Sequence, residues 1–113
     1  MYRDDWTKAE KTVARRAFEL AYSRECETIA AEVRRRATTI NGAEEIWALH
    51  DYLIEQRKAT DAKYDYRYSQ LEFVFSRLVA EGWLRLDELA GLDEEKTERI
   101  RGIVKWATAA EEV

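Results

Sequence analysis

The sequence predicts one all-α domain over residues 1–113, in which a long antiparallel helical pair carries a compact C-terminal helical head. Composition supports this fold class in two ways. The chain contains no proline and only four glycines, whereas folds rich in strands and turns use more of both. Hydrophobic residues make up 46% of the chain and charged residues 37%, which is enough for a core together with long solvated helix faces.

The first predicted helix begins after Thr7 and meets no helix-breaking residue before Ile40. Thr7 and Glu10 have the spacing of a capping box, in which each side chain accepts a hydrogen bond from the other residue's backbone amide. Asn41 and Gly42 predict the end of the helix, because both tolerate left-handed backbone. One stripe of this helix carries Tyr22, Cys26, Ile29, Val33, Ala37 and Ile40. A stripe of this length requires a long partner helix.

The segment that follows predicts this partner helix, so that residues 8–64 form the helical pair. One of its faces carries Ile46, Leu49, His50, Leu53 and Arg57, and the adjoining face carries Trp47, Asp51 and Ile54. Tyrosines alternate with charged residues between positions 61 and 68. A short loop and a frayed helical bend both fit this alternation, and we favour a bend.

Residues 69–107 predict the helical head. The apolar face of its first helix consists of Leu71, Val74, Phe75 and Leu78. This helix is expected to end near Gly82, and Leu86–Leu89 to form a short helical turn. Asp93 predicts the N-cap of the last helix, because a carboxylate there accepts hydrogen bonds from free backbone amides. The apolar face of the last helix consists of Ile100, Ile103, Val104 and Ala107.

Charge and residue counts argue against several classes of protein. A net charge of -4 is unfavourable for a general nucleic-acid binder, which needs a surplus of cations. No apolar run reaches the ~18 to 20 residues of a membrane span, and the first residues lack the apolar segment of a signal peptide, so a cytoplasmic protein without a transmembrane segment is expected. The single cysteine and single histidine cannot build a disulfide framework or a Cys/His zinc site. We therefore expect no metal and no cofactor.

An enzyme is not expected either. His50 and Asp51 are similar to the dyad of metal-dependent phosphohydrolases, but that site needs further histidines and the chain has none. Cys26 and His50 are a weak candidate for a nucleophilic pair, because Cys26 lies on an apolar stripe where a thiol is expected to pack. A metal-dependent hydrolase that uses His50 and Asp51 is kept as the less favoured alternative.

The cluster of Trp47, His50, Asp51 and Arg57 is the most informative part of the sequence. Asp51 and Arg57 are six positions apart, about 240° around a helix, so they cannot pair within it. If they pair, another helix provides the contact, which indicates a two-fold dimer where the Asp of each copy meets the Arg of the other. Alternatively, Trp47 and His50 pack against the first helix while Asp51 and Arg57 are solvated. Spacing alone leaves both possibilities open.

Phe73 is the second informative residue. It points about 180° away from the centre of the apolar face of its helix. Phe73 is therefore either an exposed anchor for a partner or a residue packed on another helix of the head. On the last helix, Arg99 and Trp106 are seven residues apart and flank the apolar face together, which gives a further candidate contact.

The same segments contain several short motifs whose spacing matches that of a known protein family. Residues 46–53 read IWALHDYL, and they are followed by Arg57 and by DAKYDYR at 61–67. The pattern continues in Phe73-Val74-Phe75, Glu81-Gly82 and Glu88-Leu89. With these motifs the chain resembles the fluorescence recovery protein family of cyanobacterial photoprotection, from the region of Trp6 to about Ile103.

The resemblance implies a non-enzymatic, all-helical regulator that acts as a homodimer. Proteins of this family bind the photoactivated red form of the orange carotenoid protein, mainly through its C-terminal domain. They hasten its return to the orange form and help to detach it from the phycobilisome, which ends non-photochemical quenching and restores antenna fluorescence. The implied location is the cytoplasm, at the cytoplasmic face of thylakoid membranes. In a host that lacks the orange carotenoid protein, the implied role is a helical adaptor for another protein.

The resemblance also assigns roles to individual residues. The functional Trp, His, Asp and Arg of the family fall on Trp47, His50, Asp51 and Arg57. The partner-binding aromatic residue of the head falls on Phe73, and a basic position of the last helix falls on Arg99, where the family pattern has lysine. The implied dimer interface consists of Ile46, Trp47, Asp51, Leu53 and Arg57.

Overall fold

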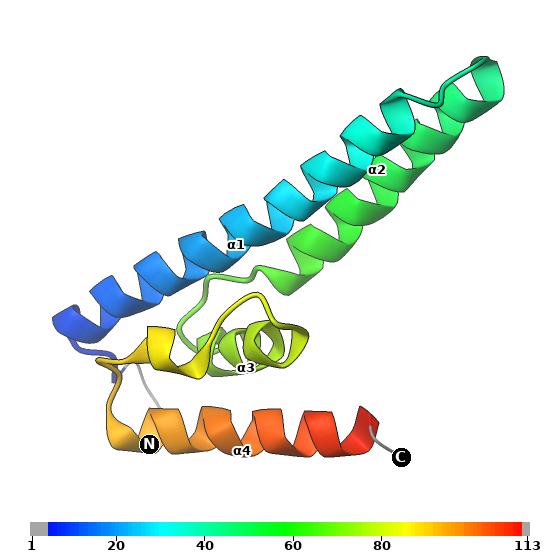
Figure 1. Cartoon of the computed structure of the whole chain (residues 1–113). Helices are drawn as coiled ribbons and strands as arrows, with labels where there is room; N and C mark the ends of the chain where they lie inside the picture. The colour runs from blue at the N-terminus through cyan, green and yellow to red at the C-terminus, as the bar shows by residue number, and fades with distance from the viewer. Residues whose placement is uncertain (1–4, 112–113) are drawn as a thin grey trace.

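The computed structural model describes residues 5–111, and helices make up most of that range (Figure 1). Their bounds are Lys8–Ala37 for α1, Ala43–Lys63 for α2, Leu71–Glu81 for α3, Leu86–Leu89 for the 3-10 helix η1, and Glu94–Glu111 for α4. Helices α1 and α2 form an antiparallel pair, the stalk, and α3, η1 and α4 form a head at its base. The molecule measures 56 × 35 × 24 Å. The predicted all-α class is confirmed.

Helix α1 begins with the predicted capping box but ends earlier than expected. The Glu10 amide donates to Thr7 Oγ1 at 3.1 Å, and the Thr7 amide donates to Glu10 Oε1 at 2.9 Å. The prediction that the helix continues to Ile40 was wrong, because α1 ends at Ala37. The hydroxyls of Thr38 and Thr39 donate to carbonyls of the last turn, at 2.7 and 3.1 Å. These carbonyls would otherwise accept hydrogen bonds from the backbone amides of a further helical turn.

Helix α2 continues to Lys63, and residues 64–67 are irregular. Residues 61–63 thus belong to α2 and residues 64–67 form a short loop, so the favoured prediction of a helical bend was wrong. Two of its tyrosines lie against α1: the rings of Tyr64 and Tyr66 meet the ring of Phe18 edge-on, at centroid distances of 5.3 and 4.8 Å. The connection from the stalk to the head thus follows the surface of α1.

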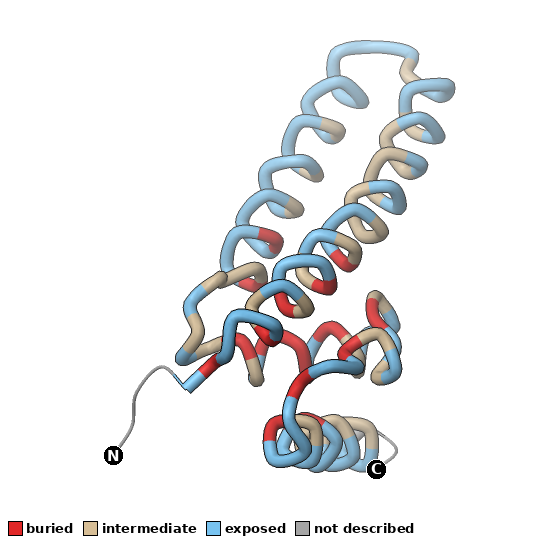
Figure 2. The backbone as a smooth tube through the Cα atoms, turned by 90° about the vertical axis from the view of Figure 1, so that its left-hand side faces the viewer, coloured by how far each residue is buried: buried red, intermediate tan, exposed pale blue. Residues whose placement is uncertain are grey.

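The buried core lies where the head meets the base of the stalk (Figure 2). Helix α3 contributes the predicted apolar face, and it packs on α4. Helix α1 contributes three alanines spaced by three and four residues, and these small side chains let the head approach the helix closely. The buried hydrophobic residues are Trp6, Ala14, Ala17, Ala21, Leu71, Val74, Phe75, Leu78, Leu84, Leu89, Leu92 and Ile100.

Local signals set the turns of the head. Gly82 has φ 90° and ends α3 as predicted, and the following Trp83 amide donates to the Leu78 carbonyl at 2.9 Å. Gly91 has φ 113°, and a Cβ there would lie 2.7 Å from Val13 Cγ2, so only glycine lets this turn pass α1. Asp93 caps α4 as predicted, because its Oδ1 accepts the Lys96 amide at 2.8 Å.

The half of the stalk far from the head is poorly covered within one chain. Figure 2 shows it as exposed and intermediate along both helices. On the predicted stripe of α1, Tyr22 is 45% exposed and the apolar residues farther along are only half-buried. Helix α2 therefore covers this stripe only in part.

Candidate protein-interaction surfaces

The first candidate site is a row of exposed residues on α2, which we call the stalk face. It consists of Ile46, Trp47, His50, Asp51, Leu53, Ile54 and Arg57. Four of these are large hydrophobic residues, and their exposed fractions range from 39% for Leu53 to 61% for Trp47. Residues of α2 that contact α1 lie on another side of the helix, where Thr60 and Lys63 are buried. The stalk face is therefore an apolar surface that the chain does not cover itself.

The structure brings together three of the four predicted residues on this face. The rings of Trp47 and His50 meet edge-on at a centroid distance of 5.9 Å, and His50 Nδ1 lies 3.3 Å from Asp51 Oδ1. Arg57 is not part of this group, because its Nε donates to Asp61 Oδ2 at 3.1 Å. The alternative in which Trp47 and His50 pack against the first helix was wrong, since both are exposed.

The second candidate site, the head face, is a groove of about 420 Å³ between α3 and α4. Phe73 on one side is 61% exposed and Trp106 on the other is 74% exposed. Of the two possibilities for Phe73, exposure on the surface is the one observed. The remaining lining residues are Glu72, Glu98, Arg99, Gly102 and Ile103. Arg99 thus lies beside Phe73 in the wall of this groove.

Arg99 is fixed in the groove by a bidentate ion pair with Glu72. Its Nε and Nη2 donate to the two carboxylate oxygens at 2.7 and 2.9 Å. Hydrogen bonding to this carboxylate raises the pKa of Arg99 above its already high ordinary value, so the guanidinium is always charged. The head face therefore combines two exposed aromatic rings with a positioned cation, a combination that is typical of protein-binding surfaces.

Buried charges join the stalk to the head, and the sequence analysis missed them. Lys63 is 7% exposed, and its Nζ donates to Glu25 of α1 and to Glu81 of α3, both at 2.7 Å. Burial alone would raise the pKa of Glu81, but hydrogen bonds from Lys63 and Arg77 hold it below its ordinary value. Lys63 is thus the point at which α1, α2 and α3 are held together.

A second buried lysine, Lys96, joins α4 to the start of α1. Its Nζ lies 3.4 Å from both carboxylate oxygens of Glu10 and 3.3 Å from Asp93 Oδ2. Burial raises the pKa of Glu10, but backbone hydrogen bonds and the charge of Lys96 together bring it below the ordinary value. A lysine within a charged helical segment gives no sequence signal of such burial.

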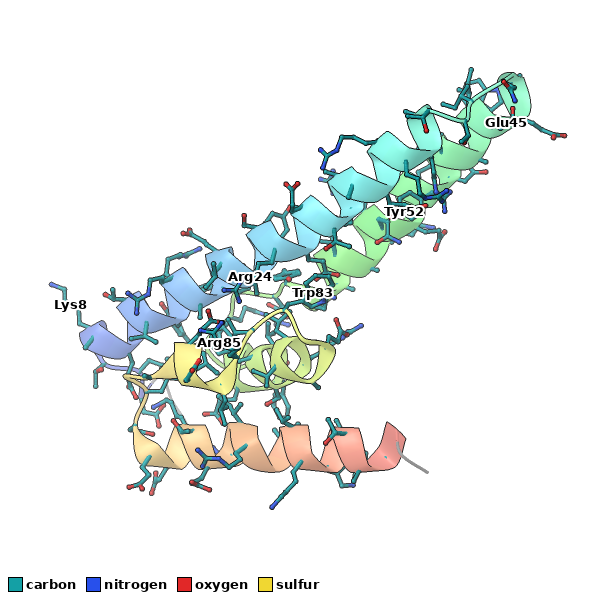
Figure 3. The ribbon with its side chains drawn as sticks, viewed as in Figure 1. Lys8, Arg24, Glu45, Tyr52, Trp83 and Arg85 are labelled. Atoms are coloured by element: carbon teal, nitrogen blue, oxygen red, sulfur yellow. The ribbon has the colours of Figure 1, made fainter. Side chains whose placement is uncertain are left out.

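Arg24 provides a third link between stalk and head. Its two terminal nitrogens donate to the carboxylate oxygens of Glu88 at 2.8 and 2.7 Å, and one of them also donates to the Trp83 carbonyl at 3.0 Å. Figure 3 shows Arg24 reaching from α1 toward the segment that carries Trp83. Hydrogen bonds from Arg24 are the largest cause that lowers the pKa of Glu88, to about 2.

Residues 5–111 contain neither a metal-binding cluster nor a membrane-spanning helix. Within residues 5–111, no three His, Cys, Asp or Glu side chains gather in a way that could hold a metal ion. His50 and Asp51 are adjacent and exposed on the stalk face, without a third ligand in that part of the chain. No helix in the described range is both long and apolar enough to cross a membrane.

Fold and surfaces together define a small helical protein whose candidate sites are exposed faces suited to binding another protein. The family model described as "Photoprotection regulator fluorescence recovery protein" matches residues 6–104. The chain therefore belongs to the fluorescence recovery protein family, which is a family of photoprotection regulators.

Similar proteins agree with this assignment over most of the chain. A fluorescence recovery protein from Synechocystis sp. PCC 6803 is 36% identical over 100 residues, which cover 88% of this chain and 92% of that protein. The structure of the Fremyella diplosiphon fluorescence recovery protein has a TM-score of 0.83 at 44% identity, and covers 89% of this chain and 99% of that one. The Synechocystis structure has the same TM-score at 36% identity, covering 88% and 98%.

Proposed function

We propose that this protein binds the photoactivated red form of the orange carotenoid protein through its head face. It acts as a cytoplasmic homodimer, accelerates the return of its partner to the orange form and promotes detachment from the phycobilisome. The observation that carries the proposal is Phe73, a large aromatic residue held 61% exposed beside a positioned Arg99 on a face that nothing in the described chain covers. Membership of a photoprotection-regulator family supports the class of partner.

Acceleration requires unequal binding to the states of the partner. A regulator that bound the red form, the orange form and the barrier between them equally well would change neither the rate nor the equilibrium. The head face is therefore expected to bind a surface of the C-terminal domain that is accessible in the red form. It stabilises the transition state for the return to the orange form more than it stabilises the red form itself.

The stalk face supports a two-fold dimer with a definite geometry. Asp51 and Arg57 lie three residues before and three residues after Ile54, and about 60° to either side of it around the helix. If two α2 helices meet in antiparallel fashion at Ile54, each Asp51 lies at the same level along the helices as the Arg57 of the other copy, and a crossing angle between the helices brings the two side chains closer. The four exposed hydrophobic residues of α2 then cover one another across the axis.

To form this dimer, Arg57 and Asp51 would exchange their present contacts for a contact with each other across the interface. The free-energy cost of this exchange is small. In the single chain, Arg57 pairs with Asp61 and His50 lies against Asp51, and all four side chains are more than half exposed. Exposed pairs of this kind contribute little to stability. Arg57 is therefore free to turn toward the Asp51 of another copy, where partial burial strengthens the contact.

The direct test mixes this protein with photoactivated orange carotenoid protein and follows the decay of the red absorbance in the dark. We expect the decay to be faster in proportion to the amount of added protein until the partner is saturated. An unchanged decay, with the protein folded and dimeric, would contradict the proposal and favour a helical adaptor with another partner.

Replacing Phe73 with alanine is expected to weaken binding of the C-terminal domain of the partner by about 2 kcal/mol, or roughly 30-fold, because a central aromatic anchor is lost. Folding should change little, since the ring is mostly exposed in the free protein. Titration and a thermal melt of the same variant measure the two effects.

The matched control is Phe75→Ala on the same helix. Phe75 is fully buried, so its truncation should destabilise the fold by roughly 3–5 kcal/mol and lower the melting temperature. A comparable loss of stability in Phe73→Ala would show that Phe73 acts in folding, and would remove it from the proposed site.

Replacing Arg57 with lysine is expected to slow the recovery of the partner while circular dichroism stays unchanged. Lysine keeps the charge but loses the planar group that can bind a carboxylate through two nitrogens. The control is Arg35→Lys, because Arg35 also binds a carboxylate, that of Glu32, at an exposed position of the stalk. Equal recovery rates for both variants would exclude Arg57 from the functional set.

A further inference from the structure

The first turns of α1 carry a cluster of cations, which we call the basic face. Lys8, Lys11, Arg15 and Arg16 lie with Thr12 and Glu19 around a shallow depression of about 450 Å³. At about 100° per residue, these six residues share the side of α1 opposite to the buried Ala14 and Ala17. Figure 3 shows Lys8 extending outward from the start of α1, away from α4.

The basic face differs from the other charged surfaces in the few acids that match Lys8, Arg15 and Arg16. Many cations elsewhere are paired, as Arg35 and Arg36 are with Glu32 and Arg77 is with Glu81. Among the residues that the structure describes, none provides a carboxylate within 4 Å of Lys8, Arg15 or Arg16. Glu19 is the one acid that lines the depression. A chain of net charge -4 thus concentrates positive charge at Lys8, Arg15 and Arg16.

Tyrosines hold two of these cations and connect the basic face to the head face. The Arg15 guanidinium lies 3.9 Å from the ring centroid of Tyr66, and the Lys11 ammonium lies 5.0 Å from that of Tyr68. Tyr68 also lines a groove of about 300 Å³ that contains Phe73 and Arg99. The two faces therefore form one continuous surface, which a single partner can cover.

The kind of partner follows from the chemistry of the basic face. A helix that binds a membrane inserts apolar side chains. Here the apolar side of α1 is buried against the head, and the exposed large hydrophobic residues of the described chain all lie outside residues 8–19. A face of long cations beside aromatic rings, continuous with an aromatic docking groove, matches an acidic protein surface.

We propose that the basic face binds an acidic surface of the same protein partner whose apolar surface docks at Phe73. This inference rests on the proposed function and adds a second contact area, residues 8–16 of α1, to the head face. Its contribution is long-range attraction that speeds association, so it should be strong at low ionic strength and lost at high ionic strength.

The test is a charge reversal with a matched control. Arg15→Glu/Arg16→Glu changes the basic face, and Arg34→Glu/Arg35→Glu makes the same change of net charge at neighbouring arginines of the same helix, far from the head. Decay of the photoactivated orange carotenoid protein is followed with each variant and with the wild type. Measurements at ~0.01 M and ~1 M salt compare Debye lengths of about 30 and 3 Å. Circular dichroism and melting confirm that each variant is folded.

At low salt we expect Arg15→Glu/Arg16→Glu to accelerate recovery at least about tenfold less than the control variant, and at high salt the two should agree. Equal acceleration at low salt, or a difference that persists at high salt, would overturn the inference and leave the proposed function intact. Wild type that fails to accelerate recovery at all would contradict both. Sedimentation with phosphatidylserine vesicles provides a separate check, because loss of vesicle binding in Arg15→Glu/Arg16→Glu with unchanged recovery would assign the face to a membrane instead.

Discussion

Ile46→Glu is expected to convert the protein from dimers to monomers at micromolar concentration. Ile46 is 47% exposed in the single chain and lies on the stalk face, which the proposed dimer buries. The two-fold symmetry places two new carboxylates in one interface, and a buried unpaired charge costs several kcal/mol. Light scattering and sedimentation of wild type and variant measure the change directly.

The control for this prediction is Ala59→Glu. Ala59 is exposed on α2 but lies about 140° around the helix from Ile46, away from the stalk face. A glutamate there adds the same charge outside the interface, so this variant should remain dimeric. If the wild type were already monomeric, or if both variants behaved alike, the stalk face would not be the dimer interface.

The proposed dimer would also bear on function, because it would double the number of head faces. Two head faces on one rigid assembly can engage two partners, or two sites on one partner, without any new contact. Ile46→Glu therefore separates binding from assembly. We expect its head to remain folded, since the buried core lies at the base of the stalk and the first turn of α2, which carries Ile46, lies at the opposite end (Figure 1).

The parts of the fold that sequence predicted well are those that depend on local contacts. The capping box of Thr7, the apolar face that includes Phe75, and the N-cap at Asp93 all depend on residues within one or two helical turns. The same periodicity placed Phe73 opposite the apolar face of its helix, but it left open whether another helix covers the ring, which the structure shows to be exposed. Such signals act before the chain is compact, so they can be recognised in the sequence alone.

Burial of charged residues could not be predicted in the same way. Lys63 meets Glu25 and Glu81, which are 38 and 18 residues distant in sequence, only because the head folds back on the stalk. For Arg57, spacing predicted only that a pair with Asp51 needs another helix, and in the single chain its exposed side chain pairs with Asp61. The basic face, in contrast, had a readable signal in the spacing of Lys8, Lys11 and Arg15 on one side of a helix.

Replacing Lys96 with methionine is expected to destabilise the fold by about 3–5 kcal/mol, because Glu10 would remain buried without its cation. Glu10 is 4% exposed and Lys96 is fully buried, so water cannot replace the lost contact. Chemical denaturation of wild type and variant measures the difference. The control is Lys105→Met, at an exposed position of the same helix, which should change stability by less than about 0.5 kcal/mol.

The pH dependence of the stability difference between the wild type and Lys96→Met identifies the cause of that difference. In the folded protein the pKa of Glu10 lies below its ordinary value of 4.5 and the pKa of Lys96 lies above its ordinary value of 10.5. The lowered pKa of Glu10 stabilises the folded protein at pH values above 4.5, and this stabilisation is lost as the pH falls through the pKa of Glu10 in the folded state. The raised pKa of Lys96 stabilises the folded protein at pH values below 10.5. The ion pair therefore contributes fully between about pH 5 and pH 10.

In Lys96→Met, burial acts on Glu10 without the opposing charge, so protonation of Glu10 removes the unpaired buried charge and begins at a higher pH than in the wild type. The stability difference between the two proteins should be largest near neutral pH and should narrow as pH falls below about 4.5. A difference that is the same at pH 7 and pH 3.5 would mean that the introduced methionine side chain disturbs packing instead of leaving a buried charge. The double variant Glu10→Gln/Lys96→Met distinguishes these causes at neutral pH, because removal of the carboxylate charge should restore much of the lost stability.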